Sequence, residues 1–136
     1  MSKARIERTI PQAIEVLERY FPDGVIPSAY NGYIAAFGAS VVQSGLKATL
    51  ALFENTNAST VGDRSCLTKI ILEILDPDHG LQANEAHREG GCPGASLLRY
   101  VVERPNEERI LKEKILDIAV AVKLAIRTFK LDKQGG

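Results

Sequence analysis

The chain has 136 residues, which is the size of one domain with its own hydrophobic core. Its 17 Lys and Arg residues balance its 17 Asp and Glu residues, so the formal net charge is zero. Proteins that bind nucleic acid on their own usually carry a clear basic excess, so any basic patch here must be local and shared with partners. The two cysteines form no disulfide framework and the first residues contain no signal-peptide core, which together predict a reduced, cytoplasmic setting.

Apolar residues at helical spacing predict a helix over residues 3–21. This segment contains Pro11, at which a helix either begins or kinks. Because Ile6 keeps the phase of the later apolar positions, we expect the longer helix, with Pro11 inside it. Residues 22–24 end this helix, and Pro27 suits the first turn of the next one.

The apolar centre of the sequence is residues 33–53, where Lys47 is the one charged residue. Polar residues in its middle argue against a membrane span and favour a buried helical hairpin. Gly45, between a helical run and Leu46, predicts a left-handed C-terminal cap, so almost no loop joins the two helices. Gly38 on the apolar side lets another backbone come close, at about 1 kcal/mol of helix propensity. The expected core positions are Tyr30, Ile34, Phe37 and Val41, widened by Tyr33 and Val42, and then Leu46, Leu50 and Phe53.

Three further helices are predicted, over residues 60–75, 95–103 and 107–131. Residues 76–94 are rich in Gly and charge and are expected to form a mobile loop. No strand-like alternation is visible. The expected core residues of the three helices are Leu67, Ile70, Ile71, Ile74, Leu97, Leu98, Val101, Leu111, Ile115, Ile118, Val122, Ala125 and Phe129. The elements together predict an all-α, single-domain bundle of about six helices over residues 1–136.

Side chains with reactive or metal-binding chemistry gather in one irregular segment. They are Asp76, Asp78, His79, His87 and Cys92. Their spacing matches no compact zinc signature, and a Cys–His pair without a local signature is weak evidence for a nucleophile. No Gly-rich phosphate loop with its Lys is present. We therefore expect no catalytic residue, no metal, no cofactor and no small-molecule substrate.

Three cations step by four and three along the final predicted helix and so share one of its faces: Lys123, Arg127 and Lys130. No acid interrupts that face, so a phosphate backbone can lie along it. The alternative interpretation is that these charges only complement the negative end of the helix and face solvent.

The final helix also carries more apolar width than a simple surface helix requires. Leu116, Val120 and Leu124 broaden its stripe beyond the core positions. This surplus either fills the core of the bundle or forms a surface that packs on neighbouring subunits.

The hairpin resembles the signature of a known family. The matching positions are Tyr33, Phe37, Gly38, Gln43, Ser44, Gly45 and Leu46, followed by Thr49 and Leu50. Residues 10–13, 26–30 and 124–129 are similar to the same family, whereas residues 55–94 match nothing in it. The family is the small α-helical subunit of the type III-B CRISPR effector, the Cmr complex.

The resemblance implies a non-catalytic subunit that lines the channel in which target RNA pairs with guide RNA. Its implied partners are other Cmr effector subunits, copies of itself, and the guide and target RNA. The family offers no catalytic motif to transfer, so the cations at Lys123, Arg127 and Lys130 are a prediction from this sequence alone. Two alternatives stay open: a self-associating helical adaptor with no nucleic-acid role, and a small enzyme that uses Cys92 with a His.

Overall fold

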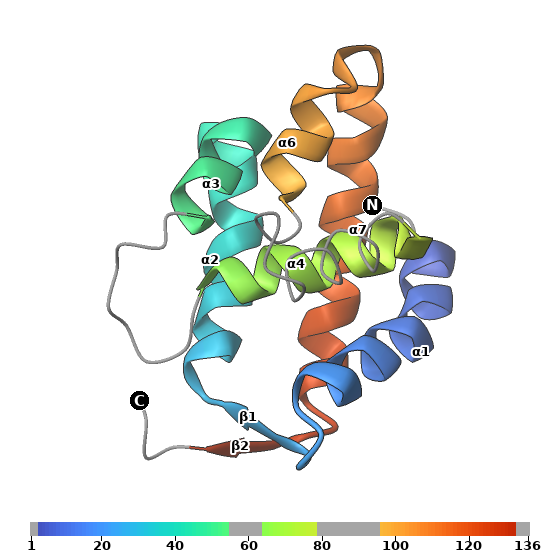
Figure 1. Ribbon diagram of the computed structural model, residues 1–136, viewed down its shortest axis with the longest axis vertical. Helices are drawn as coiled ribbons and strands as arrows, with labels where there is room; N and C mark the ends of the chain where they lie inside the picture. The colour runs from blue at the N-terminus through green and yellow to red at the C-terminus, as the bar shows by residue number, and fades with distance from the viewer. Residues whose placement is uncertain (1–2, 55–63, 79–95, 133–136) are drawn as a thin grey trace, which may run out of the picture.

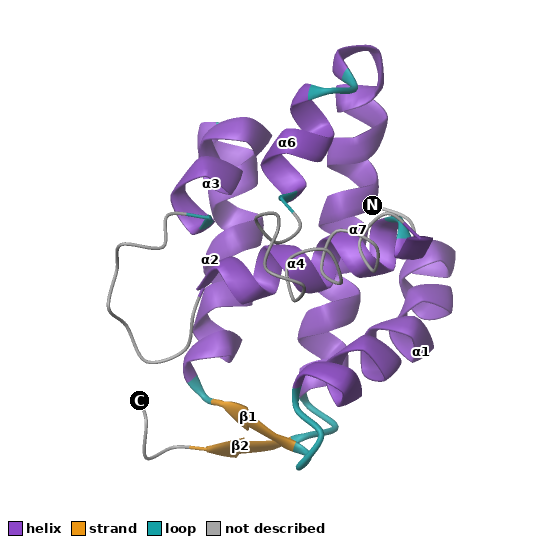
Figure 2. Ribbon diagram, viewed as in Figure 1, coloured by secondary structure: helices purple, strands orange, loops and turns teal. Residues whose placement is uncertain are grey.

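The computed structural model describes residues 3–54, 64–78 and 96–132. The elements in these ranges are α1 (Lys3–Tyr20), β1 (Val25–Pro27), α2 (Ala29–Ser44), α3 (Leu46–Phe53), α4 (Arg64–Leu75), α6 (Leu97–Val102), the 3-10 helix η1 (Pro105–Glu107), α7 (Glu108–Ile126) and β2 (Lys130–Asp132). Helices dominate the molecule (Figure 2). The predicted all-α bundle is confirmed.

The bundle is arranged around α7, the longest helix. Both α1 and α2 pack against α7, and α4 crosses them (Figure 1). The hairpin supplies much of the core, because Tyr30, Ile34, Phe37 and Val41 on α2 are all buried, as predicted. The predicted core positions of α3 and α4 are buried as well: Leu46, Leu50, Phe53, Leu67, Ile70, Ile71 and Ile74. Val42 is 70% exposed, so the prediction that it widens the core stripe is wrong.

Helix α1 continues through Pro11, as the phase of Ile6 predicted. A proline inside a helix costs about 3 kcal/mol, because it removes a backbone hydrogen bond and crowds the preceding turn. Burial of Ile6 on one side of Pro11 and of Leu17 on the other offsets this cost. Pro27 does not begin the next helix, because it lies in β1 and α2 starts at Ala29.

The polar contacts that join the helices include those of Glu73 and Glu54. The Tyr20 hydroxyl of α1 donates a hydrogen bond to Glu73 of α4, whose side chain is 3% exposed and lies 3.2 Å from the Arg19 guanidinium. At the start of α6, Glu54 accepts hydrogen bonds from the Ser96 hydroxyl at 2.6 Å and from the Leu98 backbone N–H at 2.8 Å. These contacts fix the angles at which α1 and α6 meet the bundle.

The last predicted helix ends five residues early. The backbone N–H groups of residues 127–129 each bond to the carbonyl three residues back, and the chain then enters β2. There it pairs in parallel with β1, with Val25 opposite Lys130 and Pro27 opposite Asp132. The prediction of a helix to residue 131 is therefore wrong. The prediction that the chain lacks strands missed this short sheet, whose three-residue strands are too short to show alternation.

Gly45 alone joins α2 to α3, which confirms the expectation of almost no loop. Its backbone N–H donates to the Val41 carbonyl at 3.1 Å and ends α2. The dihedral angles, φ 96° and ψ 160°, are not those of the predicted left-handed helical cap. They lie in an extended region at positive φ that is essentially restricted to glycine.

We predict that Gly45→Ala lowers the free energy of unfolding by about 1–3 kcal/mol, because alanine is strained at this φ. Gly32→Ala on α2 is the matched control, since a Cβ at Gly32 meets no atom within 4 Å and its φ is not positive. That control should gain up to about 1 kcal/mol of helix propensity. Urea denaturation of both variants checks the prediction, which fails if both are stabilised alike.

Candidate interaction groove and adjoining cations

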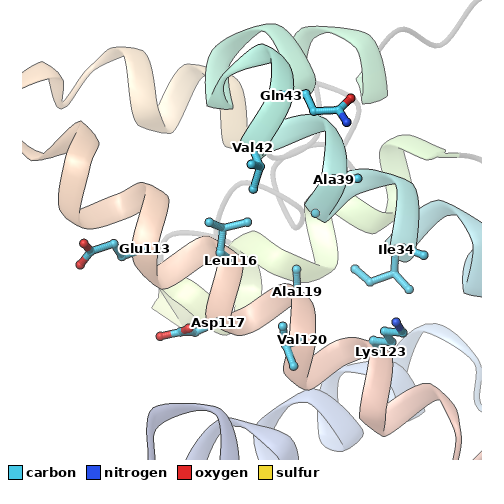
Figure 3. Close-up of a pocket in the computed structure, with 12 residues that line it drawn as sticks. Ile34, Ala39, Val42, Gln43, Glu113, Leu116, Asp117, Ala119, Val120 and Lys123 are labelled. Atoms are coloured by element: carbon cyan, nitrogen blue, oxygen red, sulfur yellow. The ribbon is translucent and has the colours of Figure 1, made fainter. Parts of the chain in front are cut away.

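An open groove with a volume of about 520 Å³ runs between α2 and α7 (Figure 3). From α2 it is lined by Ile34, Ala35, Gly38, Ala39, Val42 and Gln43. From α7 it is lined by Glu113, Leu116, Asp117, Ala119, Val120 and Lys123. Two of the three surplus apolar residues of α7, Leu116 and Val120, are half-buried and line this groove, and Leu116 also packs against the core. The third, Leu124, is exposed and does not line the groove.

The groove exists because α2 presents small side chains where it passes α7. Ala35 and Ala39 are exposed, and a Cβ placed on Gly38 would meet no atom within 4 Å. The expected close approach of another backbone to Gly38 is therefore not made within the described parts of the chain. Among the described residues, the space beside Gly38 is open.

Opposite charges mark the two ends of the groove. Glu113 is exposed at one end and Lys123 is half-buried at the other, and Figure 3 shows the apolar side chains between them. Asp117 also lines the groove, but its carboxylate is bonded to the Arg5 guanidinium of α1 at 2.9 Å. The groove is thus an apolar strip with an acidic end and a basic end.

The structure separates the three predicted RNA-contacting cations. Lys123 lies on α7 at the groove, Arg127 is the residue that follows the helix, and Lys130 lies in β2. The prediction that they share one helix face is wrong, because α7 ends at Ile126. Arg127 and Lys130 are exposed, and none of the three forms an ion pair within the described ranges.

The residues that carry the family resemblance divide into two groups. Phe37 and Leu46 are buried, and the Phe37 ring meets the Phe53 ring edge-on at 5.3 Å between centroids. Tyr33 packs on Tyr30 in a similar way, at 5.7 Å. The remaining positions are at the surface or at the turn: Gly38 and Gln43 line the groove, Ser44 is exposed, and Gly45 makes the turn.

Most of the predicted mobile loop, with His79, His87 and Cys92, lies outside the described residues, as does the predicted start of α4 at residues 60–63. Asp76 has a structural contact, because it accepts a hydrogen bond from the Tyr100 hydroxyl at 3.0 Å. Burial and this hydrogen bond raise the pKa of the Tyr100 phenol. Within the described parts of the chain, no three His, Cys, Asp or Glu side chains are placed to hold a metal ion.

None of the described helices combines the length and the apolar character needed to span a bilayer. No protein-family model matches the chain, and neither curated proteins nor solved structures include a significant match. The relation to the Cmr small subunit therefore stays a prediction from the residues quoted above.

Sequence reasoning missed two features of this site. One is the exposed face of Ala35, Ala39 and Val42, which can be read as apolar positions outside the main stripe of α2. The other is the ion pair of the buried Asp117 carboxylate, whose signal is a single acid within the apolar run 115–122 of α7. Both signals are visible in the sequence once the neighbouring helix is known.

Proposed function

We propose that this chain is a non-catalytic scaffold subunit of an RNA-guided, type III-B CRISPR antiviral ribonucleoprotein in the cytoplasm. In that assembly it packs on other Cmr effector subunits and on copies of itself, and helps to form the channel for target RNA paired with guide RNA. The observation that supports this proposal is an open apolar groove that ends at Lys123, with Arg127 and Lys130 exposed beyond it. The resemblance of the hairpin to the Cmr small subunit supports it as well.

A neutral chain can take part in RNA binding only if its contacts are few and local. Lys123, Arg127 and Lys130 would contact backbone phosphates, which carry no sequence information. Neighbouring subunits would supply the rest of the positive charge along the channel. Binding through this chain is therefore expected to be blind to RNA sequence and sensitive to salt.

We predict that changing Lys123, Arg127 and Lys130 together to Gln weakens capture of target RNA by the assembled complex. Loss of three phosphate contacts should reduce the slope of log affinity against log salt by about 2 for a single strand. The measurement is RNA binding by the reconstituted complex at several salt concentrations.

The matched control changes three exposed cations elsewhere, Arg99, Arg109 and Lys114, to Gln. It alters the net charge equally, so an effect of overall charge would appear in both variants. If the first variant binds RNA with the same affinity as the wild type at low and moderate salt, the basic site is rejected.

The alternative function, a self-associating adaptor with no nucleic-acid role, is favoured by the same groove but not by the exposed cations. The two functions differ in what accompanies a tagged copy purified from its own host. Short guide RNAs and further effector subunits are expected for the ribonucleoprotein. Recovery of the chain with itself alone would favour the adaptor.

A further inference from the structure

We propose that the groove between α2 and α7 binds a second copy of this chain across a twofold axis, with α7 antiparallel to α7 of the partner. This inference deepens the contact between copies that the proposed function includes, and a Lys123 paired in this way would leave Arg127 and Lys130 for phosphate. The inference rests on the order of the side chains that α7 presents to the groove.

Four of the six groove-lining residues of α7 follow the spacing of a two-helix seam. Glu113, Leu116, Val120 and Lys123 are separated by three, four and three residues, and all four line the groove. Leu116 and Val120 have their midpoint at position 118, and Glu113 and Lys123 have the same midpoint. In an antiparallel pair that crosses at this level, Leu116 meets the partner's Val120 and Glu113 meets the partner's Lys123. Twofold symmetry makes each of these contacts twice.

The facing side of α2 has the same kind of symmetry. The midpoint in sequence between Ala35 and Val42 is the same as that between Gly38 and Ala39. A twofold axis at that level of α2 therefore places small residues opposite one another. Gly38 has open space where a Cβ would be, which allows the partner's backbone to come close. The pairing would also cover Val42, which is 70% exposed in the single chain.

Asp117 also lines the groove, one residue from the axis, but its charge is offset by the Arg5 guanidinium at 2.9 Å. The next like charges lie where the helices diverge. Arg109 and Arg127 would face each other in the same register, each about 13 Å along α7 from the axis. At a crossing angle of about 50°, the axes of two packed helices have moved roughly 11 Å apart sideways at that distance from the crossing point. Both arginines are exposed, and salt screens charges that are separated by more than about 8 Å under physiological conditions. The contact is therefore limited to the apolar centre and the two Glu113–Lys123 pairs.

Other occupants fit the groove less well. A small ligand is usually held by polar groups that converge inside an apolar pocket, whereas here Glu113 and Lys123 lie at the two ends. A helix from an unrelated protein would require no symmetry in the charges of α7. The self-complementary order of acid, Leu, Val and base favours a second copy.

The test is sedimentation equilibrium of the full chain, free of RNA, over a range of concentrations. The wild type is expected to form a dimer reversibly. Glu113→Lys and Lys123→Glu each place like charges opposite one another twice, and each should weaken the dimer about tenfold or more. The double variant Glu113→Lys with Lys123→Glu restores both pairs and should recover the wild-type association. Glu15→Lys on the exposed side of α1 is the control for net charge and should leave association unchanged.

Gly38→Leu is a second and independent variant. Its side chain enters open space, so the single chain should fold with no loss of thermal stability, while the filled groove prevents pairing. A wild type that stays monomeric up to its solubility limit would overturn the proposal. So would a double charge swap that fails to restore pairing after both single changes abolish it. Neither result bears on whether guide RNA accompanies the tagged chain, so the proposed function is tested separately.

Discussion

Phe37→Ala is expected to lower the free energy of unfolding by about 3–5 kcal/mol. Phe37 is 0% exposed at the centre of the hairpin, and its ring meets the Phe53 ring at an angle of 83°. The substitution removes the buried ring, leaves a cavity between α2 and α3 and breaks the edge-to-face pair. For a domain of this size the loss corresponds to a melting temperature lower by roughly 10–20 °C.

The matched control is Val42→Ala, five residues further along the same helix. Val42 is 70% exposed, so dilute protein should lose no more than about 0.5 kcal/mol. Urea denaturation of both variants at low concentration measures the difference. Equal losses would contradict the placement of Phe37 in the core and of Val42 in the groove. At high concentration Val42→Ala should also weaken the twofold pairing, which Phe37→Ala affects only through folding.

The core of the hairpin could be predicted because its signal is local. Tyr30, Ile34, Phe37 and Val41 repeat every three or four residues, and each position is fixed by the helix itself. The width of the buried face could not be predicted in this way. Val42 is as apolar as Val41, but whether it is covered depends on how closely α7 approaches, which no local pattern records.

The end of α7 shows the same limit. The apolar residues of 107–131 keep helical phase as far as Phe129, so the pattern predicts no stop at Ile126. The chain leaves the helix to pair β2 with β1, a contact between residues about a hundred positions apart in sequence. Strand pairing over such a distance has no signature in strands of three residues.

The candidate site was predictable in its residues but not in its geometry. The sequence predicts Lys123, Arg127 and Lys130 as cations on one helix face that no acid interrupts, but α7 ends at Ile126 and the three do not share a helix face. The groove was not predictable at all, because it is the space that two distant helices leave between them. Gly38 indicated a close approach of another backbone, and none of the described residues makes one.

The second large effect is expected from Arg5→Ala, which should lower the free energy of unfolding by about 3–5 kcal/mol. The Asp117 carboxylate of α7 is 1% exposed and lies 2.9 Å from the Arg5 guanidinium of α1. Removal of Arg5, whose side chain is 39% exposed, takes the opposite charge from a carboxylate that is almost fully buried. The cost is the desolvation of that charge, which the guanidinium otherwise offsets.

Lys47→Ala separates this effect from that of an ordinary ion pair. Lys47 and Glu108 are 3.0 Å apart, almost the same distance, but their side chains are 57% and 42% exposed. Loss of this pair should cost no more than about 1 kcal/mol, because both charges stay hydrated. If the two losses measured by urea denaturation are equal, burial does not control the strength of the Arg5–Asp117 pair. The double variant Arg5→Met with Asp117→Leu completes the argument: it leaves no buried charge, so it should recover most of the stability that Arg5→Ala loses.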